Sequence, residues 1–435
     1  DHSVLANGDW YKIGVAVDGV FRVDQTLLTN LGIDPGTVDP RKIRIFGRET
    51  GMVPQANAIS RTDDLVEIPI QVTGESDGRF DAGDLVMFYG QSPHIWKARA
   101  SAANRYSHET NLYADLNYYY LNINQQTGKR IENQTVESSA SQTVSSTVQR
   151  LFREDEKYNL LRSGRMWFGD LYDLQTTYSY TFPVSNLKAG SNVTLKIQVA
   201  SRSDFANTFT ISENSGPVGT LICGTVVTAN YESMYAQVRS GTYTIPAGAI
   251  TDGALNLTLT YNKQGNAKAW LDWIEVEYEQ DLRADGGSYA FRSLQATPVA
   301  TEFVIQGSGK TIWNVTNGIV PKQIPITNSG SEMRFIMTPD SASEFIAFDQ
   351  SGLNQPLAVG KIQNQDLHGL AAADYIMISN PDFLSATNQL ADFHRNHYSR
   401  TVHVVTPEQI YNEYSGGRQD VSGIRDFLKQ FYDRH

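Results

Sequence analysis

The sequence predicts a mostly β protein of several domains, built as β-sandwiches or jelly rolls, followed by the beginning of an α/β domain. Three observations predict this class. Strand-length apolar alternations recur between Gly, Pro and Asn turns as far as Phe335, strands and helices alternate only after Asp374, and 435 residues are enough for two to four domains. Charged residues make up 19% of the chain, below the ~25% usual for soluble domains, which favours an extracellular β protein.

Residues 1–130 are predicted to form one β-domain. Apolar side chains alternate from Tyr11 to Val17, which places them on one face of a strand. Asp18-Gly19 predicts a type I′ hairpin turn into the next strand, because this pair accepts positive φ angles. Asp24 is suited to cap a short helix that Gly32 ends in a left-handed conformation. Further strands are expected at 20–23, 43–46, 66–72, 84–89 and 118–123.

Residues 131–285 are predicted to form a β-sandwich or jelly roll. A polar stretch at 131–149, rich in Ser, Thr and Gln, indicates a loop or linker in front of it. Turn residues then separate strand-like runs at 178–182, 193–200, 208–212, 254–261 and 270–278. Residues 286–365 contribute additional strands, around Phe303, Trp313 and Phe335, that extend or adjoin this sandwich.

Residues 366–435 are predicted to form a βαβα unit. Strands are expected at 375–379 and 401–405, and Asn380-Pro381 marks the start of the helix between them. Thr406 and Gln409 form a capping box, and an amphipathic helix follows at 424–432. Two parallel strands do not complete a sheet, so we expect the domain to continue beyond His435.

Composition excludes several functions. A net charge of −11 without a basic cluster argues against nucleic acid as a partner. The chain contains no apolar run of the ~20 residues that a membrane span needs. Its first residues lack the pattern of a leader, so a leader, if one existed, is expected to have been removed already. Cys223 is the sole cysteine and lies in an apolar strand-like run, so it is a poor candidate for a catalytic thiol.

Two C-terminal runs carry a family resemblance. IQNQDLHGLAAADYIMISNPDF and QLADFHRNHYSRTVHVVTPEQIYNEYSGGRQDVSGIRDFLKQFYDR resemble the opening of gingipain-type cysteine protease domains. Upstream, GDWYKIGVAVDGVFRV, DGRFDAGDLVMFYG, NLLRSGRMWFGD and LDWIEVEYEQDL resemble, in matching order, the sortase of the type IX secretion system within that family. The resemblance spans nearly the whole chain, and the combination of IYNEYSGG with IRDFLK is fairly specific.

This resemblance implies a surface cysteine peptidase of Bacteroidetes with a caspase-like catalytic fold. Such enzymes remove the C-terminal sorting domain from exported cargo and join the new terminus to an anionic lipopolysaccharide or similar acceptor. A thiolate attacks the carbonyl, a histidine moves the proton, and backbone N–H groups stabilise the oxyanion. The implied partners are the outer-membrane β-barrel PorV and an attachment complex. The family's His-Gly and Cys pair falls downstream of His435, so no residue here is assigned a catalytic role, no metal or cofactor is expected, and the chain alone is expected to be inactive.

Two other functions remain open. A surface carbohydrate-binding or adhesion protein without catalysis would use the sandwich itself, with Trp167-Phe168 or the pair Trp270 and Trp273 stacking on sugars. Residues three apart on a strand point to opposite faces, so core packing of at least one of Trp270 and Trp273 is expected. Alternatively, the β-domains are a pro-segment that shields the active site.

Histidines and short motifs offer weaker candidates. His394, His397 and His403 have a spacing that could hold a metal, but no Cys or carboxylate at ligand spacing accompanies them. His368 precedes the first strand of the α/β unit, where the family's catalytic histidine does not lie.

Turn chemistry explains the remaining motifs. Gly307 to Thr311 imitates the end of a P-loop, but a strand follows it, so a hairpin turn is predicted. Asp77, Asp81 and Asp84 lack the spacing of an EF-hand and are interpreted as turn residues in preference to calcium ligands. Asn-x-Thr sequons, incidental in a bacterial protein, occur at Asn133, Asn192, Asn256 and Asn314.

Overall fold

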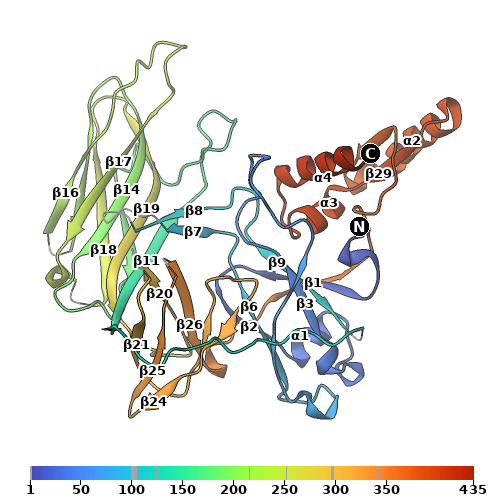
Figure 1. Cartoon of the computed structure of the whole chain (residues 1–435). Coiled ribbons are helices and arrows are strands. Elements are labelled where there is room, and N and C mark those ends of the chain that lie inside the picture. Colours follow the sequence, from blue (N-terminus) through green and yellow to red (C-terminus); the bar gives the residue numbers. More distant parts are fainter. Residues whose placement is uncertain are drawn as a thin grey trace.

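Strands dominate the computed structural model, and helices are few (Figure 1). The structure describes residues 2–98, 105–123, 125–214, 216–250, 252–294, 298–340 and 342–435. Three β modules precede an α/β segment at the C-terminus. The predicted fold class is confirmed.

The β-domain consists of two sheets that share one core. The five-stranded sheet has the order β27 (Leu357–Ile362), β1 (Trp10–Val15), β9 (Asn117–Asn122), β3 (Arg44–Gly47) and β4 (Val66–Ile68), and the three-stranded sheet has the order β2 (Gly19–Val23), β6 (Leu85–Gly90) and β5 (Gln71–Thr73). Helix α1 (Gln25–Asn30) begins where the Asp24 carboxylate accepts from the N–H of Leu27, and Gly32 follows it at φ 78°, as predicted. Ile13, Leu28 and Phe88 are fully buried in the core between the sheets.

The predicted Asp18-Gly19 hairpin is wrong. Strands β1 and β2 belong to different sheets, and Gly19 does not have a positive φ. The glycine serves a close approach instead, because a Cβ at Gly19 would lie 2.4 Å from Nδ2 of Asn354. The chain thus crosses between sheets at this point, which lets Val20 pack against Trp313 of another module.

The large sandwich comprises residues 146–281. One sheet has the order β11 (Ser146–Glu154), β19 (Lys268–Asp281), β14 (Val193–Arg202) and β17 (Gln237–Ile245), with β12 (Leu171–Tyr172) pairing to β19. The other has the order β13 (Thr177–Pro183), β18 (Ala254–Asn262), β15 (Thr208–Glu213) and β16 (Gly216–Ile222). All five strands predicted here are present. Part of the predicted linker is strand, because β11 starts within it.

The small sandwich comprises strands β20 to β26 together with β10. One sheet has the order β20 (Ser288–Leu294), β26 (Ala342–Phe348), β22 (Thr311–Asn314) and β23 (Lys322–Gln323), and the other has the order β10 (Gln142–Val144), β21 (Thr301–Gln306), β25 (Glu332–Met337) and β24 (Thr327–Ser329). A strand does follow Gly309, as predicted. The predicted hairpin is wrong, however, because β21 and β22 lie in different sheets and the turn crosses from one to the other.

A two-stranded hairpin connects the β-domain to the large sandwich. It consists of β7 (Ile95–Ala98) and β8 (Tyr106–Glu109), and in Figure 1 it extends from the β-domain toward β11. The main-chain N–H of Tyr106 donates to Glu277, and that of His108 donates to Glu275, both on β19. The hairpin therefore rests on the outer face of the β11-β19-β14-β17 sheet.

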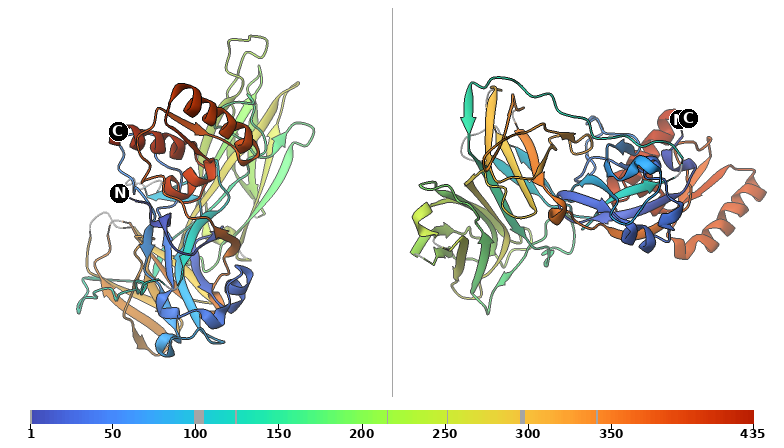
Figure 2. Two further views of the ribbon diagram at one scale, coloured as in Figure 1. Left: turned by 90° about the vertical axis from the view of Figure 1, so that its right-hand side faces the viewer. Right: turned by 90° about the horizontal axis from the view of Figure 1, so that it is seen from below.

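The α/β segment, residues 366–435, has the predicted βαβα order. Strands β28 (Tyr375–Ile378) and β29 (Val402–Val405) are parallel, and the helices are α2 (Leu384–Tyr398), α3 (Pro407–Tyr414) and α4 (Val421–Arg434). The Thr406–Gln409 capping box is present. No helix within the described residues is long and apolar enough to cross a membrane. Seen from below, the β-domain lies between the large sandwich and the α/β segment (Figure 2).

Candidate functional site

The α/β segment meets the β-domain through buried polar groups, and we call this contact the junction. On α3, Asn412 and Glu413 are 3% and 0% exposed, and in the turn that follows, Ser415 and Arg418 are 0% and 2% exposed. Buried polar groups are costly unless they are hydrogen-bonded. Their partners therefore determine how the two parts are held together.

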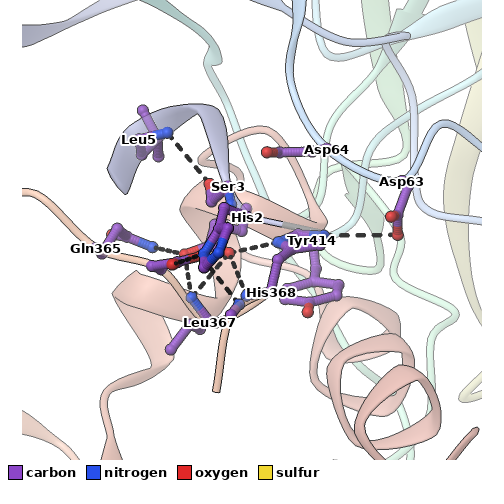
Figure 3. Close-up of polar contacts among 12 residues, drawn as sticks. His2, Ser3, Leu5, Asp63, Asp64, Gln365, Leu367, His368 and Tyr414 are labelled. Carbon is purple, nitrogen blue, oxygen red and sulfur yellow. Dashed lines mark hydrogen bonds and ion pairs between the residues drawn. The ribbon is translucent and has the colours of Figure 1, made fainter. Parts of the chain in front are cut away.

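Glu413 accepts hydrogen bonds from four donor groups at the entry to the α/β segment, and Figure 3 labels the residues that supply them, Gln365, Leu367 and His368. Its carboxylate accepts from the main-chain N–H of Leu367 at 2.9 Å and from the N–H of His368 at 3.1 Å. The Nε2 of Gln365 donates at 2.8 Å, and Nδ1 of His368 lies 2.5 Å from Oε2. The buried carboxylate thus fixes the residues that lead into β28 against α3.

His368 is an internal ion-pair partner. Its ring stacks on Tyr414 with the centroids 4.7 Å apart, and its Nε2 lies 3.5 Å from a carboxylate oxygen of Asp63 in the β-domain. Burial disfavours the charged imidazole, but the bond to Glu413 and the negative charges of Asp64, Glu413 and Asp63 together outweigh burial, so the pKa of His368 is raised. His368 joins the two parts of the junction.

Cations from both sides of the junction bond to main-chain carbonyls. Arg48 of the β-domain donates to the carbonyl of Tyr414 at 2.6 Å and to that of Thr62 at 2.5 Å. Arg418 of the α/β segment donates in the opposite direction, to the side chain of Asn117 and to the carbonyl of Glu49 at 2.9 Å. Burial lowers the pKa of Arg418 to about 10, which leaves it charged at neutral pH.

Strand β1 supplies a third cation. Lys12, 5% exposed, donates from Nζ to the side-chain oxygen of Asn412 at 3.0 Å and to the carbonyl of Gly417 at 3.3 Å. The hydroxyl of Tyr120, on the neighbouring β9, donates to the same oxygen of Asn412 at 2.7 Å. The five-stranded sheet therefore contacts α3 directly.

The loop after β3 contacts α4. Asp420, the N-cap residue of α4, accepts from the N–H of Val53 at 2.8 Å as well as from Ser422 of its own helix. Arg61 pairs with Asp426 at 2.6 Å, and both side chains are mostly buried. The N-terminal residues also contact the α/β segment. The main-chain N–H of Ser3 donates a hydrogen bond to the carboxylate of Asp366 at 2.9 Å.

Cys223 lies in the core of the large sandwich, away from the junction. It is 2% exposed, and burial raises the pKa of its thiol to about 11. A protonated, inaccessible thiol is a poor nucleophile. These observations fit the expectation that Cys223 is not catalytic.

The three C-terminal histidines are not gathered into a metal site. His394 packs against the ring of Tyr375, His397 stacks on Phe393, and Nε2 of His403 bonds to the carbonyl of Ala371. Elsewhere, Asp77 and Asp84 accept from the backbone N–H groups of Arg79 and Asp81, as turn residues do. In the part of the chain that the structure describes, no group of three potential ligands is close enough to hold a metal.

The tryptophans of β19 differ from expectation. A β-bulge opposite Gln198 and Val199 leaves Asp272 without a partner in the register, so Trp270 and Trp273 lie on the same face of the strand. Alternation alone had placed them on opposite faces. Trp270 is 5% exposed and packs against Phe168, so the expected core role of one of the pair is confirmed, whereas Trp273 is only partly buried.

Comparison with known proteins shows what the chain is similar to. The model of peptidase family C25 matches residues 368–435. No curated protein is significantly similar to the chain in sequence. Among solved structures, dimeric latent PorU from Porphyromonas gingivalis is similar over 100% of this chain and 40% of its own length, with 25% identity and a TM-score of 0.87. This chain is a PorU-like protein.

Two other structures are similar only in part. The C-terminal CBM6 of the LamC laminarinase from Zobellia galactanivorans is 13% identical over 30% of this chain and 98% of its own, with a TM-score of 0.17. The insecticidal δ-endotoxin Cry8Ea1 from Bacillus thuringiensis is 11% identical over 56% of this chain and 43% of its own, with a TM-score of 0.20. Neither of these TM-scores indicates a shared overall fold, whereas the TM-score of 0.87 shows that the whole chain has the same fold as the matching part of PorU.

The α/β segment is thus the part that matches the cysteine peptidase family C25, and the junction attaches it to the β-domain. The chain spans about two fifths of the length of PorU. The residues that build the junction, such as Arg48, Glu413 and Arg418, were not singled out from the sequence.

Proposed function

We propose that this chain is the N-terminal scaffold region of a cell-surface cysteine endopeptidase and transpeptidase, a sortase. In this proposal the whole protein removes the C-terminal sorting domains of type IX secretion cargo and attaches the cargo to a surface lipopolysaccharide. The observation that carries the proposal is the similarity to PorU along the entire chain, with the C25 match at its C-terminal end.

The role we assign to the β-domain is to hold the first elements of the peptidase domain in place. The junction supports this role, because Arg48, Lys12 and Arg418 reach across it and are each at most 5% exposed. Separation would leave these charges and the backbone groups they bond to without partners, at a cost of several kcal/mol. This argues for a permanent scaffold and against a pro-segment that leaves the enzyme.

The proposed location is the bacterial surface, in association with the outer membrane. The proposed partners are the sorting domains of cargo, the β-barrel PorV with its attachment complex, and a lipopolysaccharide acceptor. Catalysis is assigned to a cysteine and a histidine downstream of His435. The 435-residue chain itself is therefore expected to have no peptidase activity.

A cleavage assay tests the proposal. The full-length parent protein and the 435-residue chain are each incubated with a reporter that carries a C-terminal sorting domain. We expect thiol-dependent release of the sorting domain by the parent only, and unchanged activity in a parent with Cys223→Ala. Cleavage by the 435-residue chain that Cys223→Ala abolishes, or a parent that leaves the reporter intact, would refute it.

A further inference from the structure

The outer face of the large sandwich carries a groove beside the β7–β8 hairpin. Its volume is about 640 Å³, within the ~300–1,000 Å³ typical of small-ligand sites. The hairpin forms one wall through Lys97, Ser107 and Glu109, and strands β11, β19, β14 and β17 form the floor. The floor of the groove belongs to the large sandwich, whereas the junction joins the β-domain to the α/β segment.

Two rows of side chains cross the floor from strand to strand. In the first, Glu154, Trp273, Gln198 and Ser240 are successive partners across β11, β19, β14 and β17. In the second, Phe152, Glu275, Lys196 and Thr242 are partners in the same way. Directly opposed residues of antiparallel strands share a face, so both rows point toward the hairpin side of the sheet. Of the two aromatic residues in these rows, Phe152 is stacked against His108 and Trp273 lines the groove, so the floor combines an indole with closely spaced hydrogen-bonding groups.

The bulge in β19 is what places an indole in this groove. Because Asp272 is the extra residue, Trp273 shares the outward face with Glu275. The Trp273 ring meets that of His108 at 82° with the centroids 5.6 Å apart, and its indole lines the groove. Packing against His108 fixes the orientation of a partly exposed aromatic ring.

The polar groups of the floor are held in place by their neighbours. The amide nitrogen of Gln198 donates to Asp272 at 2.6 Å. His108 lies between Glu275, 2.7 Å from Nδ1, and Glu154, 2.9 Å from Nε2. Lys196 donates to Glu275 at 3.3 Å. A ligand here meets donors and acceptors that need no reorganisation, which is the condition for a preorganised site.

The charges that line the groove balance. Lys97, His108 and Lys196 carry positive charge, Glu109, Glu154 and Glu275 carry negative charge, and each cation contacts at least one of these carboxylates. No net charge is left to attract a phosphate or a cationic peptide, since such ligands need an excess of the opposite sign. An uncharged ligand with many hydroxyl groups and an apolar ring face suits the groove.

We propose that this groove binds a neutral saccharide, with one sugar ring packed on Trp273 and its hydroxyl groups bonded to Gln198, Ser240 and Thr242. An indole offers an apolar face to the C–H groups of a pyranose, and amide and hydroxyl side chains match the alternating donors and acceptors of its hydroxyls. The large sandwich is then a glycan-binding module that accompanies the peptidase region.

A glycan array tests the proposal with the 435-residue chain, followed by calorimetry on the best neutral oligosaccharide. We expect binding to uncharged glycans, with an affinity that changes less than about twofold between 50 and 500 mM NaCl. Trp273→Ala should weaken binding at least about tenfold. Because Trp273 also packs on His108, a second variant, Thr242→Trp, fills the groove from an exposed strand position and should abolish binding.

Matched controls separate the groove from the surface around it. Thr244→Trp adds the same bulk two residues farther along β17, outside the groove, and Trp167→Ala removes an exposed tryptophan elsewhere on the sandwich. Both should bind like the unaltered chain, and thermal unfolding should confirm that Thr242→Trp is folded. Exclusive binding of sulfated or sialylated glycans, no binding to any neutral glycan on the array, or full binding by folded Thr242→Trp would overturn the proposal.

Discussion

The guanidinium of Arg48 donates a hydrogen bond of 2.6 Å to the main-chain carbonyl of Tyr414, although 366 positions separate the two residues. Tyr414 is the last residue of α3, and its carbonyl is one of the groups that a helix leaves unpaired at its C-terminus. A cation at this end also interacts favourably with the helix dipole. The β-domain thus supplies the C-terminal partner of a helix in the C25 segment.

Replacing Arg48 should destabilise the junction. Arg48→Ala leaves the buried carbonyls of Tyr414 and Thr62 without their donor, which should cost about 2–3 kcal/mol in the free energy of unfolding. Urea denaturation of the 435-residue chain measures this cost. Arg22→Ala is the control, because Arg22 is 41% exposed and its pair with Asp24 contributes at most about 1 kcal/mol. Equal stabilities of the two variants would contradict the role assigned to Arg48.

Glu413 and Glu408 offer a matched pair on one helix. Glu413 is fully buried and accepts from four donor groups, whereas the Glu408 side chain is 64% exposed. Glu413→Gln should cost about 3 kcal/mol, because it removes the charge that pairs with His368, and Glu408→Gln should stay within about 0.5 kcal/mol. Chemical denaturation at pH 6 compares them.

The same pair of variants tests the pH dependence. The pKa of His368 is raised in the folded state, so its contribution is fully present below the ordinary value of ~6.5 and is lost as the pH rises through the folded value. Glu413→Gln should remove this part of the pH dependence of stability, and Glu408→Gln should retain it. Identical pH profiles for both variants would show that the His368 contact carries no stability.

The sequence predicted the secondary structure correctly where a local pattern alone determines it. The strands of the large sandwich follow from alternation between turn residues, and the βαβα order follows from Asn380, the Thr406 capping box and the periodicity of α4. Prediction from the sequence failed where a segment distant in the chain determines which sheet a strand joins. Asp18-Gly19 has a hairpin composition, but β2 pairs with β6 in another sheet, and Asn354 lies against Gly19. Local propensity carries no information about such a partner.

The junction and the groove could not be predicted for the same reason. Glu413 in IYNEYSGG resembles an ordinary helix carboxylate, and only the fold places Gln365, Leu367 and His368 around it. The position of Trp273 depends on a bulge that lies in the pairing of β19 with β14. A single extra residue in the register reverses the face of every side chain beyond it, which no alternation rule detects.

The thiol of Cys223 should not react with thiol reagents in the folded chain. Burial both excludes reagents and raises the pKa of the thiol to about 11, so almost no thiolate exists at pH 8. We expect a disulfide reagent such as 5,5′-dithiobis(2-nitrobenzoic acid) to label no thiol in native buffer and one per chain in 6 M guanidinium chloride. Rapid labelling of the native chain would indicate an accessible cysteine and reopen its candidacy as a nucleophile.

His108 should make the contact between the hairpin and the large sandwich sensitive to alkaline pH. Burial disfavours its charged form, but hydrogen bonds to Glu154 and Glu275 outweigh burial and raise the pKa of His108 to about 9. The folded value exceeds the unfolded value of ~6.5, so the stabilisation is complete below pH ~6.5 and is lost as the pH rises through about 9. The difference of about 2.5 pKa units corresponds to about 3 kcal/mol.

Urea denaturation of the 435-residue chain between pH 6 and 10 measures this effect. The free energy of unfolding of the unaltered chain should fall over that range. His108→Gln should be less stable at pH 6 by about 3 kcal/mol, and its stability should depend less on pH, because Glu154 and Glu275 no longer contact the His108 cation. His2→Ala is the control, since the His2 side chain is 77% exposed. Parallel pH profiles for His108→Gln and His2→Ala would mean that the buried His108 is neutral and that the other contacts hold the hairpin, among them the main-chain hydrogen bonds of Tyr106 and His108.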